Sequence, residues 1–365
     1  MFCSPLSAAF WVAAGYPALH MGADRADRGS AAAGGGAIDA AGAGLFAIFP
    51  GSLEAPAIAR YSAESLDCPL LGPAALLVTE VSGEPARLVG RFERNLPDPS
   101  DGRRAFRRGS GGGPLLLGPG RLYLNLRLAT PAALTACDAS KLLNRYVRPL
   151  LRALTKVTAP THYFGRDWIS CGGAPIASIA FAHHARSGRS MIESVVAFSE
   201  PFTTLGAGAP SFLGKTPTTI EKVSTKTRNV SDLCASLAQA YADAYGLDLV
   251  HRPLPPFPAA APLAVSPPWD ATLPEAIGDI GASVDNGHLR LGGAFMASED
   301  AVREFEGRVS ALPSTATVDD VGADADAVFA GAGDVQNARI ALFGVRSLAS
   351  IRDVAFAALE KSRRA

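Results

Sequence analysis

The sequence predicts an α+β protein in which a large domain is followed by a smaller α+β domain. Hydrophobic residues make up 48% of the 365 residues and charged residues 19%, a balance that supports a sizeable core. Short apolar runs of strand length alternate with longer runs of helical periodicity. A segment with seven prolines at 251–268 separates the two parts. We therefore predict a low-complexity leader, a large domain, a Pro-rich linker and a small accessory domain, at residues 1–50, 51–250, 251–268 and 269–365.

The first 50 residues differ in texture from the rest of the chain. Residues 23–44 are rich in Ala and Gly, a composition typical of a flexible leader, and an over-long gene start explains it equally well. Residues 1–20 are apolar, but they lack a basic start and are interrupted by Pro5 and Pro17. These features argue against a signal peptide and a membrane span.

The large domain begins with a series of short strands. Residues 73–92 contain two apolar runs around Ser82–Pro85, a pattern that predicts a hairpin. Two more strands are predicted at Leu115–Leu117 and Leu122–Leu128, on either side of a Gly-Pro-Gly turn. Helices and further strands follow. Thr130 precedes a proline and apolar residues at helical spacing, so a helix is predicted over 131–155.

Strands are predicted next at 163–181 and 192–198, and a capped helix that ends in glycine at 231–246. Beyond the linker, residues 274–295 predict a hairpin around an Asp-Asn-Gly turn. Helices are predicted near 298–311 and at Ser347–Lys361. The small domain is therefore also α+β.

Charge and cysteine content narrow the function classes. Lys and Arg total 34 and Asp and Glu total 34, so the formal net charge is zero and favours neither nucleic acid nor an anionic membrane as partner. The cysteines are scattered without zinc spacing, which predicts free thiols in a reducing cytoplasm and no metal site. They are Cys3, Cys68, Cys137, Cys171 and Cys234.

The most informative stretch is FRRGSGGGP at 106–114. Adjacent glycines let main-chain N–H groups line a concavity without interference from Cβ atoms, and arginine offers a fork of donors to carboxylate or phosphate. The alternative is a Gly-rich surface turn beside solvated arginines. The strands predicted on both sides would hold the loop rigidly, so we favour an anion-binding loop.

This stretch resembles the RRxSGGG signature of the lipoate–protein ligase family, whose catalytic domain is related to that of biotin protein ligases. Arg107–Gly113 matches it without a gap, and Gly90-Arg91-Phe92, Asn125 in YLNLRL and Gly165-Arg166-Asp167 resemble its other elements. The resemblance covers about residues 52–245. It implies a mixed sheet flanked by helices, as in the biotin/lipoate ligase-like fold, and a small C-terminal accessory domain.

The resemblance also implies an activity. ATP, with Mg²⁺, would adenylate lipoate or octanoate, and the acyl group would then pass to a lysine on a lipoyl-type carrier domain; no bound prosthetic group is implied. Main-chain N–H groups of the loop would hold carboxylate and phosphate oxygens. The residues implied to bind the acyl group and nucleotide are Arg91, Arg107, Arg108, Ser110, Gly111, Gly112, Gly113, Asn125 and Gly173.

Two positions depart from the family pattern. The family's GRKI(S/A)G stretch carries a lysine where this chain has Pro175, and a His-Gly pair where it has Ile192-Glu193. Loss of a positioned cation costs about 10²–10³-fold in rate. Turnover is therefore the open question, and no catalytic residue is assigned.

Three hypotheses follow. In the first, the chain is a ligase-like protein that binds a medium-chain acyl group or its adenylate. In the second, it is a non-catalytic subunit that binds an acyl ligand or a carrier domain. The third is an acyltransferase that uses a histidine or Cys171, although a buried strand cysteine is the favoured interpretation of Cys171. A cation opposite Gly111–Gly113, from His183, His184, Arg186 or Lys215, would indicate an enzyme. An apolar wall would indicate a pseudoenzyme.

Overall fold

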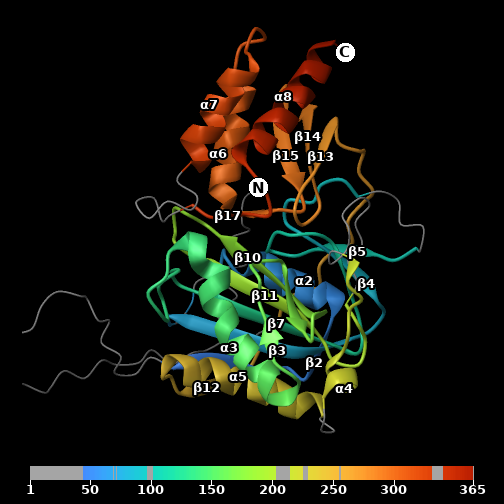
Figure 1. Ribbon diagram of the computed structural model, residues 1–365, viewed down its shortest axis with the longest axis vertical. Coiled ribbons are helices and arrows are strands. Elements are labelled where there is room, and N and C mark those ends of the chain that lie inside the picture. The colour runs from blue at the N-terminus through green and yellow to red at the C-terminus, as the bar shows by residue number, and fades with distance from the viewer. Residues whose placement is uncertain are drawn as a thin grey trace, which may run out of the picture.

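The structure is a computed structural model that describes residues 44–68, 70, 72–96, 102–202, 214–224, 229–254, 256–330 and 340–364. Figure 1 shows a large sheet with helices on both faces, and a smaller body of helices and strands at one end of it. The α+β fold predicted from the sequence is confirmed. None of the described helices is long and apolar enough to cross a bilayer.

The large sheet is mixed and has the strand order β12-β1-β3-β7-β11-β10-β9-β8, with β2 paired to β3. β1 is parallel to β12 and β3, β2 is parallel to β3, and the other neighbours are antiparallel. The strands are β1 (Leu45–Ile48), β2 (Ser52–Glu54), β3 (Ala74–Ser82), β7 (Arg121–Leu128), β8 (Thr161–His162), β9 (Trp168–Cys171), β10 (Ala174–His183), β11 (Ser190–Ala197) and β12 (Leu249–Arg252).

Two long helices cover one face of this sheet, α3 (Leu142–Val157) and α5 (Val230–Tyr245). Their apolar stripes pack on the alternate residues of β7, including Leu124 and Leu126, to form the main core. Asn229 caps α5 by accepting the N–H of Asp232, and Gly246 ends it in the left-handed conformation. The predicted capped helix with a terminal glycine is confirmed.

The other face of the sheet carries α2 (Ala55–Glu64) and a small sheet of order β5-β4-β6. These strands are β4 (Ala86–Val89), β5 (Ala105–Arg107) and β6 (Leu115–Leu117). The hairpin predicted within 73–92 is wrong, because β3 pairs in the large sheet whereas β4 pairs with β5 and β6. Local turn residues at Ser82–Pro85 are compatible with a change of sheet as well as with a hairpin.

The C-terminal body consists of a sheet of order β13-β14-β15, a two-stranded β16-β17 pair and three helices. The predicted hairpin is confirmed, with Asn286 and Gly287 both at positive φ. Its elements are β13 (Ala271–Pro274), β14 (Asp279–Asp285), β15 (His288–Gly293), β16 (Met296–Ala297), α6 (Glu299–Ser310), α7 (Val318–Phe329), β17 (Leu342–Phe343) and α8 (Leu348–Arg364).

Some element boundaries differ from the sequence prediction. The helix predicted from residue 131 begins at Leu142, after a turn and the short 3₁₀ helix η1 (Ala139–Lys141). The Thr-Pro pattern at 130–131 therefore starts a turn that Tyr146 holds by donating its hydroxyl to Pro131 O at 2.6 Å. Helices α2, α7 and the short α4 (Ile220–Val223) were not predicted.

Two segments predicted to be a leader and a linker contain ordered structure. Residues 45–48 form β1, which lies between β12 and β3 in the large sheet, so ordered structure begins before the predicted end of the leader at residue 50. Within the Pro-rich segment, Leu263 donates its N–H to Ala105 O at 2.8 Å, so part of this segment packs on the large body. The division of the chain into domains stays a prediction, and residues 1–43 lie outside the described residues.

Candidate functional site

The RRxSGGG loop, residues 107–113, connects two short strands. β5 enters it at Arg107, β6 leaves it at Leu115, and the two strands pair on either side of β4. Close backbone approach explains the glycines here. A Cβ on Gly90 would lie 2.0 Å from Gly112 O, and one on Gly111 would lie 2.3 Å from Phe295 O. The loop is therefore packed closely against neighbouring backbone, and its rigidity stays a prediction.

Arg107 organises the neighbouring turn. Its Nη1 donates to the carbonyl oxygens of Gly90 and Arg91, each at 3.1 Å, and to Glu93 O at 2.5 Å. Burial lowers the pKa of its guanidinium. Arg107 therefore stabilises protein backbone in this structure, through donors that the family resemblance assigns to a ligand.

Arg108 is the buried charge of the site. Its side chain is 4% exposed, and Nη2 donates to Gly113 O at 2.9 Å. Burial lowers its pKa, and the nearby carboxylates of Glu193 and Asp167 oppose that effect. Burial also raises the pKa of Asp167 to about 6. A buried cation of this kind requires a counter-charge close by.

Glu193 supplies that counter-charge. It lies on β11, is 2% exposed, and its Oε2 accepts the main-chain N–H of Ser110 at 3.1 Å. Its Oε1 accepts the hydroxyl of Tyr123 and the amide of Asn125, the latter at 3.5 Å. Because Ser110 lies inside the RRxSGGG loop, a carboxylate of the protein itself occupies a donor of the predicted anion-binding loop.

The glycine N–H groups are also taken by protein acceptors. Gly111 donates to Phe181 O at 3.1 Å and Gly112 donates to Phe295 O at 2.9 Å. With Ser110 bound to Glu193, three consecutive loop donors have internal partners. In this arrangement they do not fit an ATP phosphate or an acyl carboxylate, which would need the same N–H groups.

The atoms that face Gly112 and Gly113 most closely belong to apolar side chains, one main-chain carbonyl and Arg108 of the loop itself. A Cβ on Gly112 would meet Met296 and Ala180, besides Arg108 of the loop itself, and one on Gly113 would meet Ile277 O and Ala294. Most of this wall comes from the C-terminal body. The pseudoenzyme interpretation stays a prediction.

Three of the residues proposed as substitute cations have described partners outside the loop. His183 Nδ1 lies 2.9 Å from Ser190 Oγ, and His184 Nδ1 lies 3.8 Å from Asp300. The main-chain N–H of Arg186 donates to the same aspartate at 2.8 Å. Cys171 is buried in the core on the side of α3, away from Glu193. Its interpretation as a buried strand cysteine agrees with this position.

Of the remaining predicted site residues, Arg91 borders the loop, because its main-chain N–H donates to Ser110 O at 2.7 Å, whereas Gly173 lies in another turn. Arg91 forms an ion pair with Glu299 at the start of α6, which ties the loop region to the C-terminal body. Gly173, at φ +83°, lies in the β9–β10 turn. Glu193 pairs with Ala180, so Pro175 lies five residues, or roughly 16 Å, back along β10. Lys215 Nζ lies near Gly173 and 5.8 Å from the centre of the Trp168 ring.

The site therefore contains groups that the sequence argument did not single out. Glu193 was noted only as a departure from the family pattern, and Tyr123 and Ser62 were missed. Ser62, on α2, accepts the N–H of Gly109 at 2.6 Å. The available signal was an acidic residue in the otherwise apolar strand SMIESVVA, because buried charges in proteins are paired.

The turn beside Arg107 predicts a pH dependence. Burial raises the pKa of Glu93 from 4.5 to about 7, although Arg107 nearby lowers it. The folded chain then binds this proton more tightly than the unfolded chain, so its contribution to stability is complete below about pH 4.5 and is lost as pH rises through 7. We expect Glu93→Gln to be more stable than wild type at pH 8, by on the order of 2 kcal/mol, and less different at pH 5.

Urea unfolding of both proteins at pH 5 and pH 8 measures this change. Glu84→Gln, at a side chain that is 87% exposed, is the control and should match wild type at both values. An identical free-energy difference for Glu93→Gln at pH 5 and pH 8 would contradict the prediction.

Comparison with known proteins gives matches among solved structures. No protein-family model matches the sequence, and no curated protein matches it. Among solved structures, the chain is similar to LipL1 of P. falciparum in complex with lipoate, at 10% identity and a TM-score of 0.53. That match covers 78% of this chain and 94% of LipL1.

Two further matches have lower TM-scores. A lipoate-protein ligase A bound with ATP matches at 10% identity and a TM-score of 0.46. This match covers 57% of the present chain and 89% of the ligase chain. A bi-partite lipoate protein ligase of Thermoplasma acidophilum, described with its E2 lipoyl domain, matches at 12% identity and a TM-score of 0.45. This match covers 58% of the present chain and 88% of the ligase. From the agreement with LipL1 over nearly its whole length, we conclude that this chain has the biotin/lipoate ligase-like fold in a divergent sequence.

Proposed function

We propose that this protein is a non-catalytic relative of lipoate–protein ligases that acts as a binding subunit, with a lipoyl-type carrier domain as its partner. One observation carries the proposal: the carboxylate of Glu193 accepts the N–H of Ser110 inside the RRxSGGG loop. The protein thus carries its own anion where the family resemblance places the anion of a ligand.

A carboxylate is a close chemical equivalent of the group that such a ligase would activate. Glu193 offers two oxygens to a main-chain N–H, a phenol hydroxyl and an amide, with the buried cation of Arg108 nearby. A ligand carboxylate would need the same donors and the same cation. Because Glu193 is covalently attached, it competes with any free ligand at a high effective concentration.

The missing lysine supports the same conclusion. Pro175 occupies the position where the family carries a cation over the acyl-adenylate, and the cation nearest to Gly112 is Arg108 of the loop itself. An adenylation site without this cation would lose about 10²–10³-fold in rate, and occupation of the loop by Glu193 reduces binding further. Retention of the fold without these groups favours binding of a partner over turnover.

A second candidate function is acyl adenylation with ATP and lipoate or octanoate. Lys215 favours it, because its Nζ lies beside Gly173, in the turn that precedes Pro175. In this candidate, Lys215 would supply the cation from another segment, and the loop would have to release Glu193. Mg²⁺ would accompany ATP.

ATP–pyrophosphate exchange with lipoate and with octanoate separates the two candidates. We expect no exchange above background, at least about 10³-fold below a working lipoate ligase used as positive control. Exchange by wild type that is lost in Lys215→Ala would overturn the non-catalytic proposal and establish the second candidate. Lys222→Ala, at another exposed lysine, is the matched control.

Carrier binding is measured separately. An isolated lipoyl domain with its target lysine is titrated into the full chain by calorimetry, with and without ATP. Binding that does not require ATP is the expected result. Absence of binding under both conditions would contradict the carrier as partner.

A further inference from the structure

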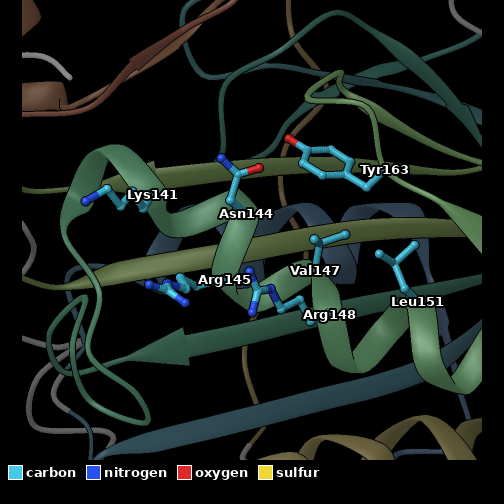
Figure 2. A pocket seen from close by; sticks show the side chains of 7 residues that line it. All are labelled: Lys141, Asn144, Arg145, Val147, Arg148, Leu151 and Tyr163. Carbon is cyan, nitrogen blue, oxygen red and sulfur yellow. The ribbon is translucent and has the colours of Figure 1, made fainter.

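A groove runs along the exposed side of α3, on the face of the large sheet opposite the RRxSGGG loop. It has a volume of about 460 Å³, and Figure 2 shows its lining side chains. One lining residue, Tyr163, comes from the segment between β8 and β9, and the others come from α3 and its start. They are Lys141, Asn144, Arg145, Val147, Arg148, Leu151 and Tyr163.

The groove is strongly cationic. Lys141, Arg145 and Arg148 recur at helical spacing, and Arg152 continues the same stripe beyond the groove. Over eleven residues of helix, this stripe is roughly 16 Å long. The chain as a whole has zero net charge, so the stripe is a local concentration of one sign.

Most of this charge is not neutralised within the chain. Lys141 Nζ lies 3.0 Å from Asp138 Oδ2, but no ion pair joins Arg145, Arg148 or Arg152 to another residue in the described part of the chain. Two ionisable groups close to these arginines are neutral at pH 7, because burial raises the pKa of Cys137 to about 11 and also raises the pKa of Tyr245.

The floor of the groove is apolar. Val147 is buried, Leu151 and Tyr163 are half-buried, and Asn144 is exposed at the edge. An apolar strip flanked by cations favours an amphipathic ligand with negative charge. A free phosphate or a small dicarboxylate would leave the apolar strip uncovered, and it would not reach the whole stripe.

We propose that this groove is a docking surface for an acidic, amphipathic segment of a partner protein, with apolar residues on Val147, Leu151 and Tyr163 and carboxylates on the arginines. The surface lies on the opposite face from the Glu193 network, so docking there leaves the loop and the C-terminal body undisturbed. This proposal goes beyond the proposed function, because it is argued from the side chains that line the groove and does not use the RRxSGGG loop.

The chain's own acidic helix fits this surface less well than a partner does. Helix α7 carries four aspartates, but Asp320 is held by the Thr317 cap and Asp324 lies 3.8 Å from Arg308. Docking of a second copy through α7 would compete with these contacts. A partner segment with free carboxylates has no such cost.

The test uses fluorescence anisotropy with the full chain. The probe is a labelled 16-residue peptide with Glu and Leu on opposite faces of a helix, compared with the same peptide carrying Lys in place of Glu. We expect the acidic peptide to bind and the basic one not to. Binding should weaken at least tenfold in Arg145→Glu/Arg148→Glu, and it should weaken as salt increases.

The matched control is Lys222→Glu/Arg290→Glu, which makes the same change in net charge at two exposed positions outside α3. It should bind the acidic peptide like wild type. Equal binding to both double variants, or no binding to wild type, would overturn the proposal. Full displacement of the peptide by millimolar inorganic phosphate would instead indicate a small-anion site and would also overturn it. So would concentration-dependent self-association that Arg145→Glu/Arg148→Glu abolishes, because the occupant would then be a second copy.

Discussion

Glu193→Ala is expected to lower the free energy of unfolding by about 3–5 kcal/mol, the largest effect of any single substitution proposed for this protein. The variant removes the acceptor of the Ser110 N–H and the Tyr123 hydroxyl, and it leaves the charge of Arg108 buried without the carboxylate that stabilises it most. A buried donor without a partner and a buried charge without a counter-charge are both strongly unfavourable. Urea unfolding of wild type and variant measures the difference.

The same variant tests the idea that Glu193 takes the place of a ligand carboxylate. Added acetate or formate should raise the Tm of Glu193→Ala in a concentration-dependent way and leave wild type unchanged, since a ligand that binds the folded state alone stabilises it. Chloride at equal ionic strength controls for salt. A Tm that responds equally to acetate and chloride would contradict the interpretation.

Glu193→Gln keeps the size of the side chain and removes only its charge. Its amide oxygen can still accept the Ser110 N–H, but it provides no counter-charge for Arg108. We expect an intermediate loss of stability and no rescue by acetate, because the side chain still fills the space. Glu360→Ala, at an α8 side chain that is 43% exposed, is the control for removal of a carboxylate and should change stability by less than about 0.5 kcal/mol.

Gly111→Ala is expected to have the second largest effect, a loss of about 2–4 kcal/mol. A Cβ here would lie 2.3 Å from Phe295 O and 2.7 Å from Met296 Cα, which are backbone atoms of the C-terminal body. Because backbone cannot move aside as a flexible side chain does, the loop and this body must separate. The cost combines overpacking with loss of the hydrogen bond from Gly112 to Phe295 O.

Separation of the loop from the C-terminal body should also expose the chain near their contact. Limited proteolysis should cut the Gly111→Ala variant within 256–330 faster than wild type, and the Arg91–Glu299 ion pair should no longer protect this junction. Gly307→Ala is the matched control: its Cβ would meet nothing within 4 Å on α6, so the change should be neutral or stabilising by up to about 1 kcal/mol. Equal proteolysis of both variants would show that Gly111 does not couple the two bodies.

Local sequence patterns accounted for several elements and for the loop itself. Gly246 ends α5 as its position predicted, and Asn286-Gly287 forms the predicted hairpin turn. In both cases a few neighbouring residues decide the backbone conformation, so no distant contact is needed. The RRxSGGG loop was found in the same way, because its glycines and arginines are contiguous.

Other features depend on which distant segments meet. The turn at Ser82–Pro85 suits a hairpin, but β3 pairs in one sheet and β4 in another. The choice is made by the packing of whole strands, and short-range turn preferences cannot decide it.

The sequence by itself determined that this protein has an α+β fold and located a glycine loop with two arginines. Only the tertiary structure decided what that loop binds within the chain. Glu193 lies 83 positions from Ser110, and Phe295 lies further along in the C-terminal body. The physical reason is that a buried N–H or a buried cation takes whichever acceptor the fold brings within hydrogen-bonding distance, and sequence spacing does not record that distance.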